Sequence, residues 1–423
     1  MLKRIRKVAD PMAGFVKEVA PREAALDEIE KRLAFPWNCK KTEVALRGAA
    51  GRRCAEAVTS PAPYPPFRRS LRDGYAVNHM DAAGATPGTP LFLSKKGEVK
   101  MGEAPGFTLS LGEACPIPTG GMLPDGADAV VMLEDTSEAG GWVEIRRGVQ
   151  GGENVIGKGE EVAEGEELLP AGSLVDFRTV SVLAAIGAAK LPVHDIKISI
   201  LSTGDEIVPA EEQNPPLGAV RDVNGWSVGA LLSRFGFPAE YRGIVSDDGA
   251  EFERRFRCEL AACDVLILSG GSSVGVRDHC SRLFESLPEP GLLVRGINIA
   301  PGKPTLIAAD AAARKLAVSL PGHPLSCFTV GFTVLLPLLL RLIGADEREC
   351  WTRTLMPLAC DLAARTGPEE FFPCSLNADG TVSPLAAKSG YISILSGACG
   401  FIRIPEDRET ARAGEYAEVW LWR

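Results

Sequence analysis

The fold of this chain is decided by the stretch Ile196-Lys-Ile-Ser-Ile-Leu-Ser-Thr-Gly-Asp-Glu206, in which a compact apolar strand runs into a Ser-Thr-Gly turn. A second apolar run, Val265-Leu-Ile-Leu268, leads into Gly270-Gly271. Helical patterns near residues 227–235 and 250–262 follow the first strand and precede the second. Apolar strands that alternate with helices predict a parallel sheet covered on both faces. We therefore predict a doubly wound α/β domain that closes with the apolar helix after Pro324.

The sequence on either side of this domain has a different character. Near the N-terminus, residues 22–34 place apolar side chains at helical spacing. Prolines crowd residues 58–77, and short β-like stretches separated by Gly and Pro turns fill residues 73–147. From about Asp346 to Trp420 the chain again shows short strands and Gly turns. With 423 residues, the chain is predicted to hold two to four domains.

Composition excludes several classes of protein. The net charge of −9 has the wrong sign for a general polyanion binder, and 6% aromatic residues argue against stacking platforms for single-stranded nucleic acid. Neither value excludes a phosphorylated small molecule, which backbone N–H groups and a few lysines can hold. We expect no nucleic-acid partner.

The cysteines and apolar segments indicate a compartment. The 11 cysteines form no CxxC motif and are spread singly, as is typical of reduced thiols in the cytosol. The basic start of the chain is followed by no uninterrupted apolar segment of a signal peptide. The most apolar run, residues 327–340, is shorter than the ~20 residues of a typical membrane span and is interpreted as a buried helix. The prediction is a soluble, cytoplasmic protein with no membrane partner.

Four polar loops are expected at the carboxyl ends of the strands, where doubly wound sheets bind ligands. They are Ser202-Thr-Gly-Asp-Glu206, Ser269-Gly-Gly-Ser-Ser-Val-Gly275, Ala300-Pro-Gly-Lys-Pro304 and Leu320-Pro-Gly-His-Pro324. The glycines of the second loop allow its N–H groups to cradle a phosphate at a helix N-terminus. Each loop alone is equally typical of a plain connector, but all four in one α/β unit predict a site.

Charged residues in these loops have two readings each. Lys303 suits a phosphate or oxyanion, or is a solvated turn lysine. Asp205 and Glu206 are either helix-capping acids or oxygen ligands for Mg²⁺. His279 and His323 have no His or Cys partner at metal-ligand spacing, which argues against zinc, and His323 is most simply a hydrogen-bonding loop residue.

The ordered set of motifs resembles the molybdopterin molybdenumtransferases, which are related to the E domain of gephyrin. The resemblance runs from about Pro21 to the C-terminus. Its motifs are Asp73-Gly-Tyr-Ala76, Pro118-Thr-Gly120, Gly126-Ala-Asp-Ala-Val-Val131, Gly152-Glu-Asn154, Ser202-Thr-Gly-Asp-Glu206, Gly270-Gly-x-Ser-Val-Gly275, Pro301-Gly-Lys-Pro304 and Leu320-Pro-Gly-x-Pro324. Eight motifs in the same order are far more specific than any one of them.

The resemblance implies four structural parts. They are a split, elongated N-terminal domain (residues 11–59 and 148–193), an inserted β domain (60–147), a molybdopterin-binding α/β domain (194–345) and a C-terminal β-barrel-like domain (346–423). It also implies a homodimer with the site in a cleft between subunits, and a molybdopterin adenylyltransferase as a possible delivery partner.

The implied reaction inserts molybdenum from molybdate into adenylylated molybdopterin, with Mg²⁺-dependent release of AMP. Carboxylates would hold Mg²⁺ and orient the attacking oxygen, here Asp205, Glu206 and Asp278. Asp73 and Thr119 match family positions near the site and would come from the partner subunit. The residues expected to bind the pterin and its phosphates are Ser202, Thr203, Gly204, Gly270, Gly271, Ser273, Gly275, Pro301, Gly302, Lys303, Pro321, Gly322, His323 and Pro324.

The sequence departs from the family pattern at several of these positions. Arg72 stands where Met is usual, Ala300 replaces a lysine, and Val276 replaces an acid. A Ser-His pair reads Ser389-Gly390, the Asn of the Leu-Pro-Gly-Asn-Pro turn is His323, and an acid near the Gly-Glu-Asn loop is conservatively Glu161. Arginines at 72 or 277 are candidates to supply the charge lost at position 300.

These departures leave alternatives open. A diverged relative could bind molybdopterin without full catalysis, or could handle tungstate instead of molybdate. A binding or scaffold role and a nucleotide pyrophosphate hydrolase are further readings. The Asp73-Gly-Tyr-Ala76 motif and the C-terminal β domain argue against the hydrolase, because its single-domain relatives lack both. Thiols such as Cys280 and Cys327 lie beside candidate loops but are more typical of buried packing residues.

Overall fold

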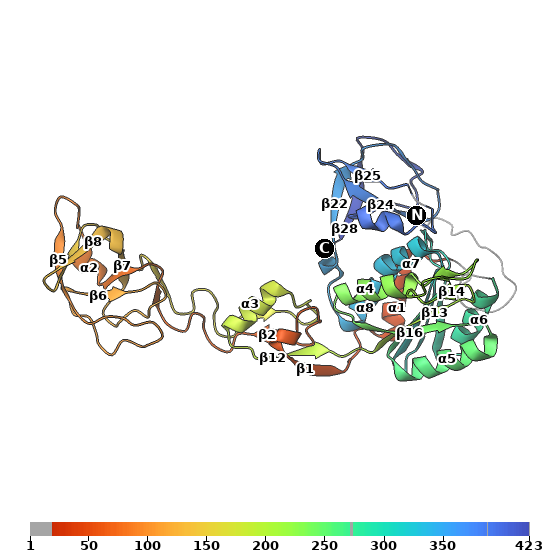
Figure 1. Cartoon of the computed structure of the whole chain (residues 1–423), viewed down its shortest axis with the longest axis horizontal. Coiled ribbons are helices and arrows are strands. Elements are labelled where there is room, and N and C mark those ends of the chain that lie inside the picture. Colours follow the sequence, from red (N-terminus) through yellow and green to blue (C-terminus); the bar gives the residue numbers. More distant parts are fainter. Residues whose placement is uncertain (1–18, 271–273, 387, 423) are drawn as a thin grey trace. The chain divides into compact units, whose positions relative to one another are not determined.

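The computed structural model describes residues 19–270, 274–386 and 388–422, and for residues 274–278 the backbone only. The chain divides into two compact units. The first comprises the residues up to Glu56, Pro170–Val180 and Ala189–Arg423, and the second comprises Ala57–Leu169 and Ser181–Ala188. Figure 1 shows the chain coloured along its sequence. The four-part division given above, with its boundaries, stays a prediction.

A six-stranded sheet forms the centre of the first unit, in the order β16-β13-β17-β21-β20-β18. Its strands are β13 (Ile198–Thr203), β16 (Ala239–Val245), β17 (Val265–Ser269), β18 (Pro290–Arg295), β20 (Leu306–Asp310) and β21 (Lys315–Leu320). The decisive stretch is therefore a strand, and β13 is buried along its whole length. The predicted alternation of strands and helices is present in this sheet.

The expectation of a wholly parallel sheet is wrong for one strand. Strands β13, β16, β17 and β21 pair in parallel, whereas β20 pairs antiparallel with both β21 and β18. The reason is the short connection between Asp310 and Lys315, because a parallel crossover needs a dozen or more residues. Strand β18 consequently runs in the same direction as the parallel strands.

Helices cover both faces of this sheet (Figure 1). On one face, Ile200 and Val318 lie in a core that also contains residues of α1 (Arg22–Leu33) and α4 (Asn224–Arg234). On the other face, the neighbouring Leu201 packs in a second core with α5 (Gly249–Ala262) and α6 (Val274–Glu285). Alternate residues of one strand thus serve two cores, which is why the strands read as continuous apolar runs.

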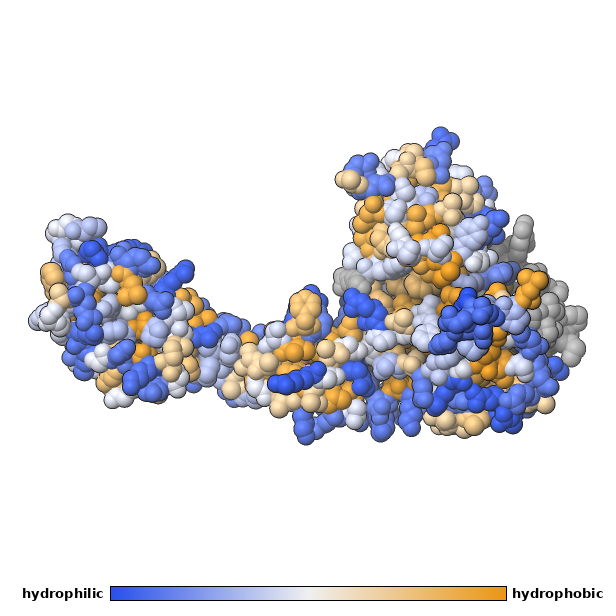
Figure 2. All heavy atoms as spheres, in the orientation of Figure 1, coloured by the Kyte–Doolittle hydropathy of each residue, from blue (hydrophilic) through white to orange (hydrophobic). Residues whose placement is uncertain are grey.

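The apolar run after Pro324 belongs to one continuous helix of 20 residues, Pro324–Ile343. It consists of α7 (Pro324–Val330), a π-helical turn η3 (Gly331–Leu335) and α8 (Leu336–Ile343). By length and composition the helix could cross a membrane, so the argument from a short run was wrong. Most of it is buried inside the protein, as predicted for a core helix. On the face shown in Figure 2, apolar residues lie in scattered groups among hydrophilic ones.

The C-terminal part of the first unit is rich in β-structure, as expected. Its main sheet has the order β19-β24-β26-β28-β22, with β25 paired to β24. Trp351 and Trp420 stack at 5.1 Å between ring centroids in its core. The elements are β19 (Ile299–Ala300), β22 (Trp351–Pro357), β23 (Leu362–Ala363), β24 (Glu369–Leu376), β25 (Val382–Pro384), β26 (Gly400–Ile404), β27 (Thr410–Ala411) and β28 (Tyr416–Trp422), with the turns η4 (Glu347–Glu349) and η5 (Ser393–Gly397).

The N-terminal part of the first unit is joined to the α/β domain through Arg53. Strand β1 (Lys41–Ala45) pairs with β12 (Lys190–His194), and η1 (Leu46–Gly48) follows β1. The fully buried Arg53 guanidinium donates to the carbonyls of Phe235 (2.8 Å) and Gly172 (3.0 Å) and pairs with Glu349. These contacts satisfy a charge that would otherwise be costly to bury.

The second unit is built around another six-stranded sheet, in the order β7-β4-β6-β5-β9-β8. Two short ribbons, β2–β11 and β3–β10, complete its strands. The elements are β2 (Val58–Thr59), β3 (Arg69–Ser70), β4 (Gly74–Val77), α2 (His79–Ala82), β5 (Leu91–Lys95), β6 (Glu113–Ile117), β7 (Ala129–Met132), η2 (Leu133–Asp135), β8 (Thr136–Ala139), β9 (Trp142–Ile145), β10 (Val155–Ile156), β11 (Glu167–Leu169) and the end of α3 (Phe177–Ala185). The mixed α/β character and the β-rich C-terminus of the chain are confirmed.

Candidate functional site

The four predicted loops meet at one edge of the central sheet. Three of them follow the parallel strands β13, β17 and β21 at their carboxyl ends. The third loop, residues 300–304, lies between the end of β18 and the start of β20. Because β20 runs in the opposite direction, its start lies at the carboxyl edge of the other strands. The antiparallel direction of β20 thus places the third loop at the carboxyl edge of the sheet, where the four loops were expected.

A buried hydrogen-bond network around Asp222 joins two of these strand ends. The Asp222 carboxylate accepts from Ser202 Oγ (2.6 Å), from Tyr241 OH (2.7 Å) and from the Gly225 N–H (3.0 Å). Ser202 Oγ also lies 3.0 Å from Ser269 Oγ at the end of β17. The network therefore fixes the ends of β13 and β17 relative to the first turn of α4.

The second loop begins with a residue that must be glycine. Gly270 has φ +110°, and a Cβ there would lie 2.1 Å from the Thr203 carbonyl oxygen. No other residue fits this approach of two strand ends. Gly271 and Ser273 lie outside the described residues, while Gly275 lies in the first turn of α6. The described backbone on either side of them belongs to a strand end and to a helix start, as a phosphate cradle requires.

Carboxylates gather where β13 and β16 end, and we call Asp205, Glu206 and Asp247 the acidic side. Asp205 Oδ1 accepts from the Asp247 N–H at 3.0 Å. Burial raises the pKa of Asp247, and the charges of Asp205 and Glu206 raise it further. These carboxylates are therefore close enough to repel one another, which favours a cation nearby.

Two basic residues lie at the other end of the edge, beside β21 and β20, and we call Lys303 and His323 the basic side. Both side chains are exposed. His323 Nδ1 lies 3.1 Å from Ser389 Oγ, and the Ser389 carbonyl accepts from the Leu325 N–H at 3.0 Å. The histidine turn is thus tied to the C-terminal region. Strand β17 lies between the two sides.

The predicted metal ligands are only partly tested by the geometry. Among the described residues, no three His, Cys, Asp or Glu side chains are placed to hold a metal ion together. Asp278 lies in α6, but its side chain is outside the described part of the structure. Mg²⁺ keeps several waters and commonly uses one or two carboxylates together with substrate phosphates. One or two carboxylates of the acidic side would be enough for such an ion, with waters and substrate oxygens completing its ligands.

Three buried polar atoms at this edge have no hydrogen-bond partner among the described residues. They are Thr203 Oγ1, Asn224 Oδ1 and Asp247 Oδ1. Asn224 Nδ2 donates to the Gly322 carbonyl at 2.8 Å, which holds the Asn224 amide against the fourth loop. A buried polar atom without a partner costs free energy, about 1–3 kcal/mol, unless a water or ligand satisfies it. Such atoms mark this edge as a place where polar groups bind.

The second unit holds the remaining pair of predicted residues. Asp73 immediately precedes β4, and Thr119 follows β6, the strand that pairs with β4. Asp73 Oδ1 accepts from the Thr119 N–H at 2.7 Å. The structure therefore brings Asp73 and Thr119 together on an exposed turn.

The departures from the family pattern fall at surface or edge positions. Arg72 is exposed beside Asp73, and Glu161 pairs with Arg69 at 3.0 Å. Ala300 belongs to β19, which pairs with β24 of the C-terminal sheet. Gly390 is exposed in the turn that holds Ser389. The side chains of Val276 and Arg277 are outside the described residues.

The thiols near the loops are not set up as nucleophiles. Burial raises the pKa of Cys280 to about 12 and raises that of Cys327 as well. Both side chains are completely buried. Since the thiolate is the reactive form, these cysteines behave as small apolar core residues, in line with the expectation.

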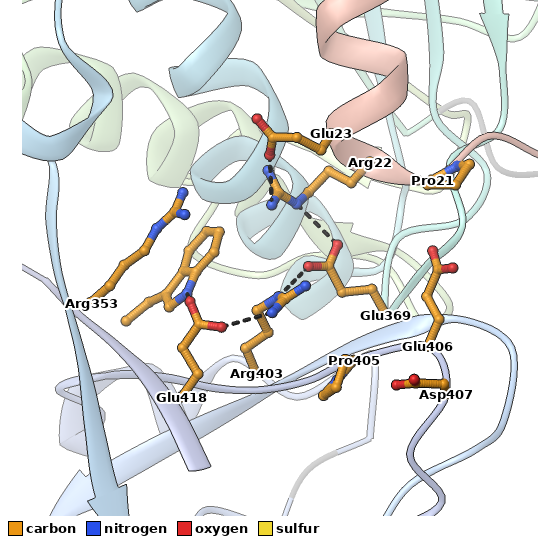
Figure 3. Close-up of a pocket in the computed structure, with 11 residues that line it drawn as sticks. Pro21, Arg22, Glu23, Arg353, Glu369, Arg403, Pro405, Glu406, Asp407 and Glu418 are labelled. Carbon is orange, nitrogen blue, oxygen red and sulfur yellow. Dashed lines mark hydrogen bonds and ion pairs between the residues drawn. The ribbon is translucent and has the colours of Figure 1, made fainter. Parts of the chain in front are cut away.

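A separate hollow of about 610 Å³ lies beside the start of α1, and no residue of the four loops lines it. Figure 3 shows its charged residues in a network: Arg22 Nε lies 3.0 Å from Glu369, and Arg403 pairs with Glu369 and with Glu418 (2.7 Å). The Arg353 guanidinium lies over the Trp420 ring at 4.3 Å. The ion pairs of Arg22, Glu369, Arg403 and Glu418 thus join α1 to the C-terminal sheet.

Sequence reasoning missed several residues at this edge. Asp222, Asn224 and Tyr241 lie outside the four loops, and Ser269 was counted only as a loop start. Asp247 follows β16, a predicted strand whose carboxyl end was not considered as a fifth loop. The available signal was its position, since every parallel strand end in such a sheet is a candidate.

Comparisons with known proteins agree over most of the chain. The family model described as the MoeA N-terminal region (domain I and II) matches residues 20–187. The model described as "Probable molybdopterin binding domain" matches residues 199–341, and the MoeA C-terminal region (domain IV) matches residues 356–422. The two flanking matches set this chain apart from single-domain nucleotide hydrolases.

Whole relatives give the same result. Molybdopterin molybdenumtransferase of Haemophilus influenzae is 32% identical over 77% of this chain and 78% of its own, and that of a Nostoc species is 31% identical over 71% and 69%. The crystal structure of the molybdopterin biosynthesis MoeA protein from Pyrococcus horikosii has 33% identity and a TM-score of 0.77, covering 96% of this chain and all of that one. The chain belongs to the molybdopterin molybdenumtransferases, a family of transferases in molybdenum cofactor biosynthesis.

Proposed function

We propose that this protein inserts molybdenum from molybdate into adenylylated molybdopterin and releases AMP in a Mg²⁺-dependent step. The observation that carries the proposal is the division of the sheet edge into an acidic side and a basic side, with the end of β17 between them. A pyrophosphate bound across this edge would have its metal-binding oxygens toward one side and a cation toward the other. Molybdate, a tetrahedral dianion, suits the basic side.

The binding roles follow from the loops. The backbone around Gly270 and Gly275 would cradle phosphate oxygens, and Lys303 would supply the positive charge. The two loops of the basic side would be held in shape by their prolines and glycines, which are Pro301, Gly302, Pro321, Gly322 and Pro324. Gly302 supports this role, because its φ is +132° and a Cβ added there would lie 2.5 Å from the Val330 side chain, which excludes other residues.

Mg²⁺ would be held by Asp205, Glu206 and Asp278, with Asp247 beside them. When bound, the ion would neutralise phosphate charge and polarise the phosphorus–oxygen bond. Asp205 and Glu206 would orient the attacking water, whose oxygen bonds to phosphorus while the bridging phosphorus–oxygen bond breaks. AMP leaves with the bridging oxygen, and a carboxylate of the acidic side accepts the proton lost by the water.

The rest of the proposal concerns assembly. We place Asp73 and Thr119 of the partner subunit at the site of a homodimer. Their mutual hydrogen bond supports a shared role, since it presents one carboxylate oxygen on an exposed turn. We also propose a cytoplasmic location, consistent with the burial of the apolar helix 324–343, and delivery of the substrate by a molybdopterin adenylyltransferase.

The test is a reconstituted reaction with the full chain, adenylylated molybdopterin, Mg²⁺ and either molybdate or tungstate. AMP release and activation of an apo-molybdoenzyme are measured together. We expect both signals with molybdate, and their loss in Asp73→Ala and Glu206→Ala. Tight binding of the pterin without AMP release would show a binding role instead, and release with tungstate alone would show a different metal. Wild-type rates in both alanine variants would refute the assigned roles.

A further inference from the structure

Two exposed aromatic rings, one in the first turn of α4 and one on β16, lie next to the candidate site. Trp226 is 53% exposed and Tyr241, on the neighbouring β16, is 38% exposed. Their ring centroids lie 6.1 Å apart with an interplanar angle of 36°. Among contacting aromatic pairs in the described part of the chain, this is the one in which both rings are exposed. Packing in an apolar core does not account for it.

The rings are held in place by the site itself. Tyr241 OH donates to Asp222, which also receives the hydroxyl of Ser202 at the end of β13. A Cβ on Gly225 would lie 2.6 Å from the Tyr241 ring, so the helix backbone lies directly against that ring. Trp226 follows Gly225 in the chain. The aromatic pair is therefore a rigid extension of the Asp222 network rather than a loose surface patch.

An independent observation at the same turn indicates a ligand. Asn224, two residues before Trp226, is only 8% exposed, and its Oδ1 accepts no hydrogen bond among the described residues. Its Nδ2 is already used by the Gly322 carbonyl, so the amide is oriented with Oδ1 as a free acceptor. Thr203 Oγ1, at the end of β13, is also buried without a partner among the described residues. Both atoms lie at the same sheet edge as the aromatic pair, where N–H donors of a bound ligand would satisfy them.

We infer that the first turn of α4 is a recognition subsite for a planar heteroaromatic ring, with Trp226 as the stacking face. An aromatic face offers favourable stacking to any such ring. The inference rests on the proposed function for its two candidate rings, the pterin and the adenine of adenylylated molybdopterin. Both have the required chemistry, and the experiment separates them.

The experiment measures calorimetric affinity of the full chain for two probes, AMP with Mg²⁺ and neopterin, a pterin that carries no phosphate. Trp226→Ala should lower the affinity for the ring that binds this subsite about 5- to 100-fold. The affinity for the other ring should stay within about twofold of wild type. Trp226→Phe should keep affinity within about threefold of wild type. The matched control is Trp142→Ala, because Trp142 is also 53% exposed and lies in β9 of the second unit, where binding should not change.

The outcomes are decisive in each case. Wild-type affinity of Trp226→Ala for both probes overturns the subsite, and so does a wild-type protein that binds neither ring. Where Trp226→Ala fails to fold, Trp226→Leu is compared with Trp226→Phe, and equal affinities overturn it. Failure of the proposed function is separate: wild-type protein that binds a ring through Trp226 but releases no AMP refutes the reaction and leaves the subsite standing.

Discussion

The acidic and basic sides of the sheet edge are built in different ways. On the acidic side, carboxylates lie directly after β13 and β16, and Asp205 is hydrogen-bonded to the Asp247 backbone. On the basic side, Lys303 and His323 are exposed on loops, and the imidazole has one hydrogen bond, to Ser389. The strand ends fix the positions of the acidic residues, whereas the exposed side chains of the basic side are free to adjust.

This difference has an energetic meaning. The acidic side holds like charges close together. Burial raises the pKa of Asp247, and the charges of Asp205 and Glu206 raise it further. The basic side carries no such cost, because Lys303 and His323 are exposed to water. We infer that repulsion between its carboxylates destabilises the acidic side until a cation binds. We also infer that the exposed side chains of the basic side adjust to the anion that binds there. Four substitutions test this contrast, from the largest expected effect to the smallest.

The largest effect is expected for Glu206→Gln, which removes a charge from the acidic side and keeps the shape of the side chain. AMP release at saturating substrate should fall about 100-fold or more, because electrostatic stabilisation of a phosphoryl transfer depends on the metal that these carboxylates hold. The matched control is Asp248→Asn, since Asp248 instead caps α5 through the Ala250 and Glu251 N–H groups and Asn caps equally well. A wild-type rate in Glu206→Gln would remove the acidic side from the reaction.

On the basic side, Lys303→Ala should act mainly on binding. The KM for adenylylated molybdopterin or molybdate should rise about 10- to 100-fold, as expected for loss of a charged hydrogen bond, while kcat changes less. Lys31→Ala in α1 is the control, because that lysine is also exposed and alanine suits a helix. A fall in kcat with unchanged KM would mean that the two sides do not divide binding and chemistry.

A smaller effect is expected for Ser389→Ala, which frees the His323 ring. Loss of one exposed hydrogen bond should raise the same KM about two- to fivefold. Ser396→Ala serves as the control, since the Ser396 hydroxyl donates to the Ser393 carbonyl in the same region and not to the histidine. An equal KM for Ser389→Ala and wild type would show that the hydrogen bond from Ser389 to the His323 imidazole does not contribute to substrate binding.

The smallest effect concerns stability. The pKa of Asp247 is raised in the folded protein, so its ionisation disfavours the fold once the pH exceeds that pKa. Asp247→Asn should therefore raise the first thermal transition by about 1 °C at pH 8 in the absence of Mg²⁺. The gain should shrink as the pH falls through the raised pKa and should vanish below the ordinary aspartate value, where the wild-type carboxyl is protonated in both states. A gain of the same size at pH 8 and pH 4.5 would show that ionisation of Asp247 is not its cause.

Much of this site could be predicted because its signals are local. An apolar run followed by Gly, Ser and Asp marks a strand end, and β13, β17 and β21 all carry that signal. Their loops then meet because the sheet puts strand ends on one edge. The membrane argument depended instead on the length of a run, and the structure extends that run at both ends to a helix of 20 residues, Pro324–Ile343.

What could not be predicted depends on contacts distant in the chain. Asp222 accepts hydrogen bonds from Ser202 and Tyr241, which lie 20 and 19 residues away in the chain. Because these partners are distant, no local sequence pattern predicts the network. The reversed direction of β20 was missed because its apolar composition matches that of the parallel strands. Only the short turn before Lys315 distinguishes it, and that turn was not weighed.

Strand β19 links the Lys303 loop mechanically to the C-terminal sheet. Ile299 and Ala300 pair with Glu369 and Glu370 of β24, and Asn298 Nδ2 donates to the Gly367 carbonyl at 2.6 Å. Two residues separate that strand from Lys303, so the backbone of the lysine loop is anchored to the C-terminal sheet while the lysine side chain stays exposed. A ligand bound by Lys303 would therefore restrain the C-terminal sheet as well.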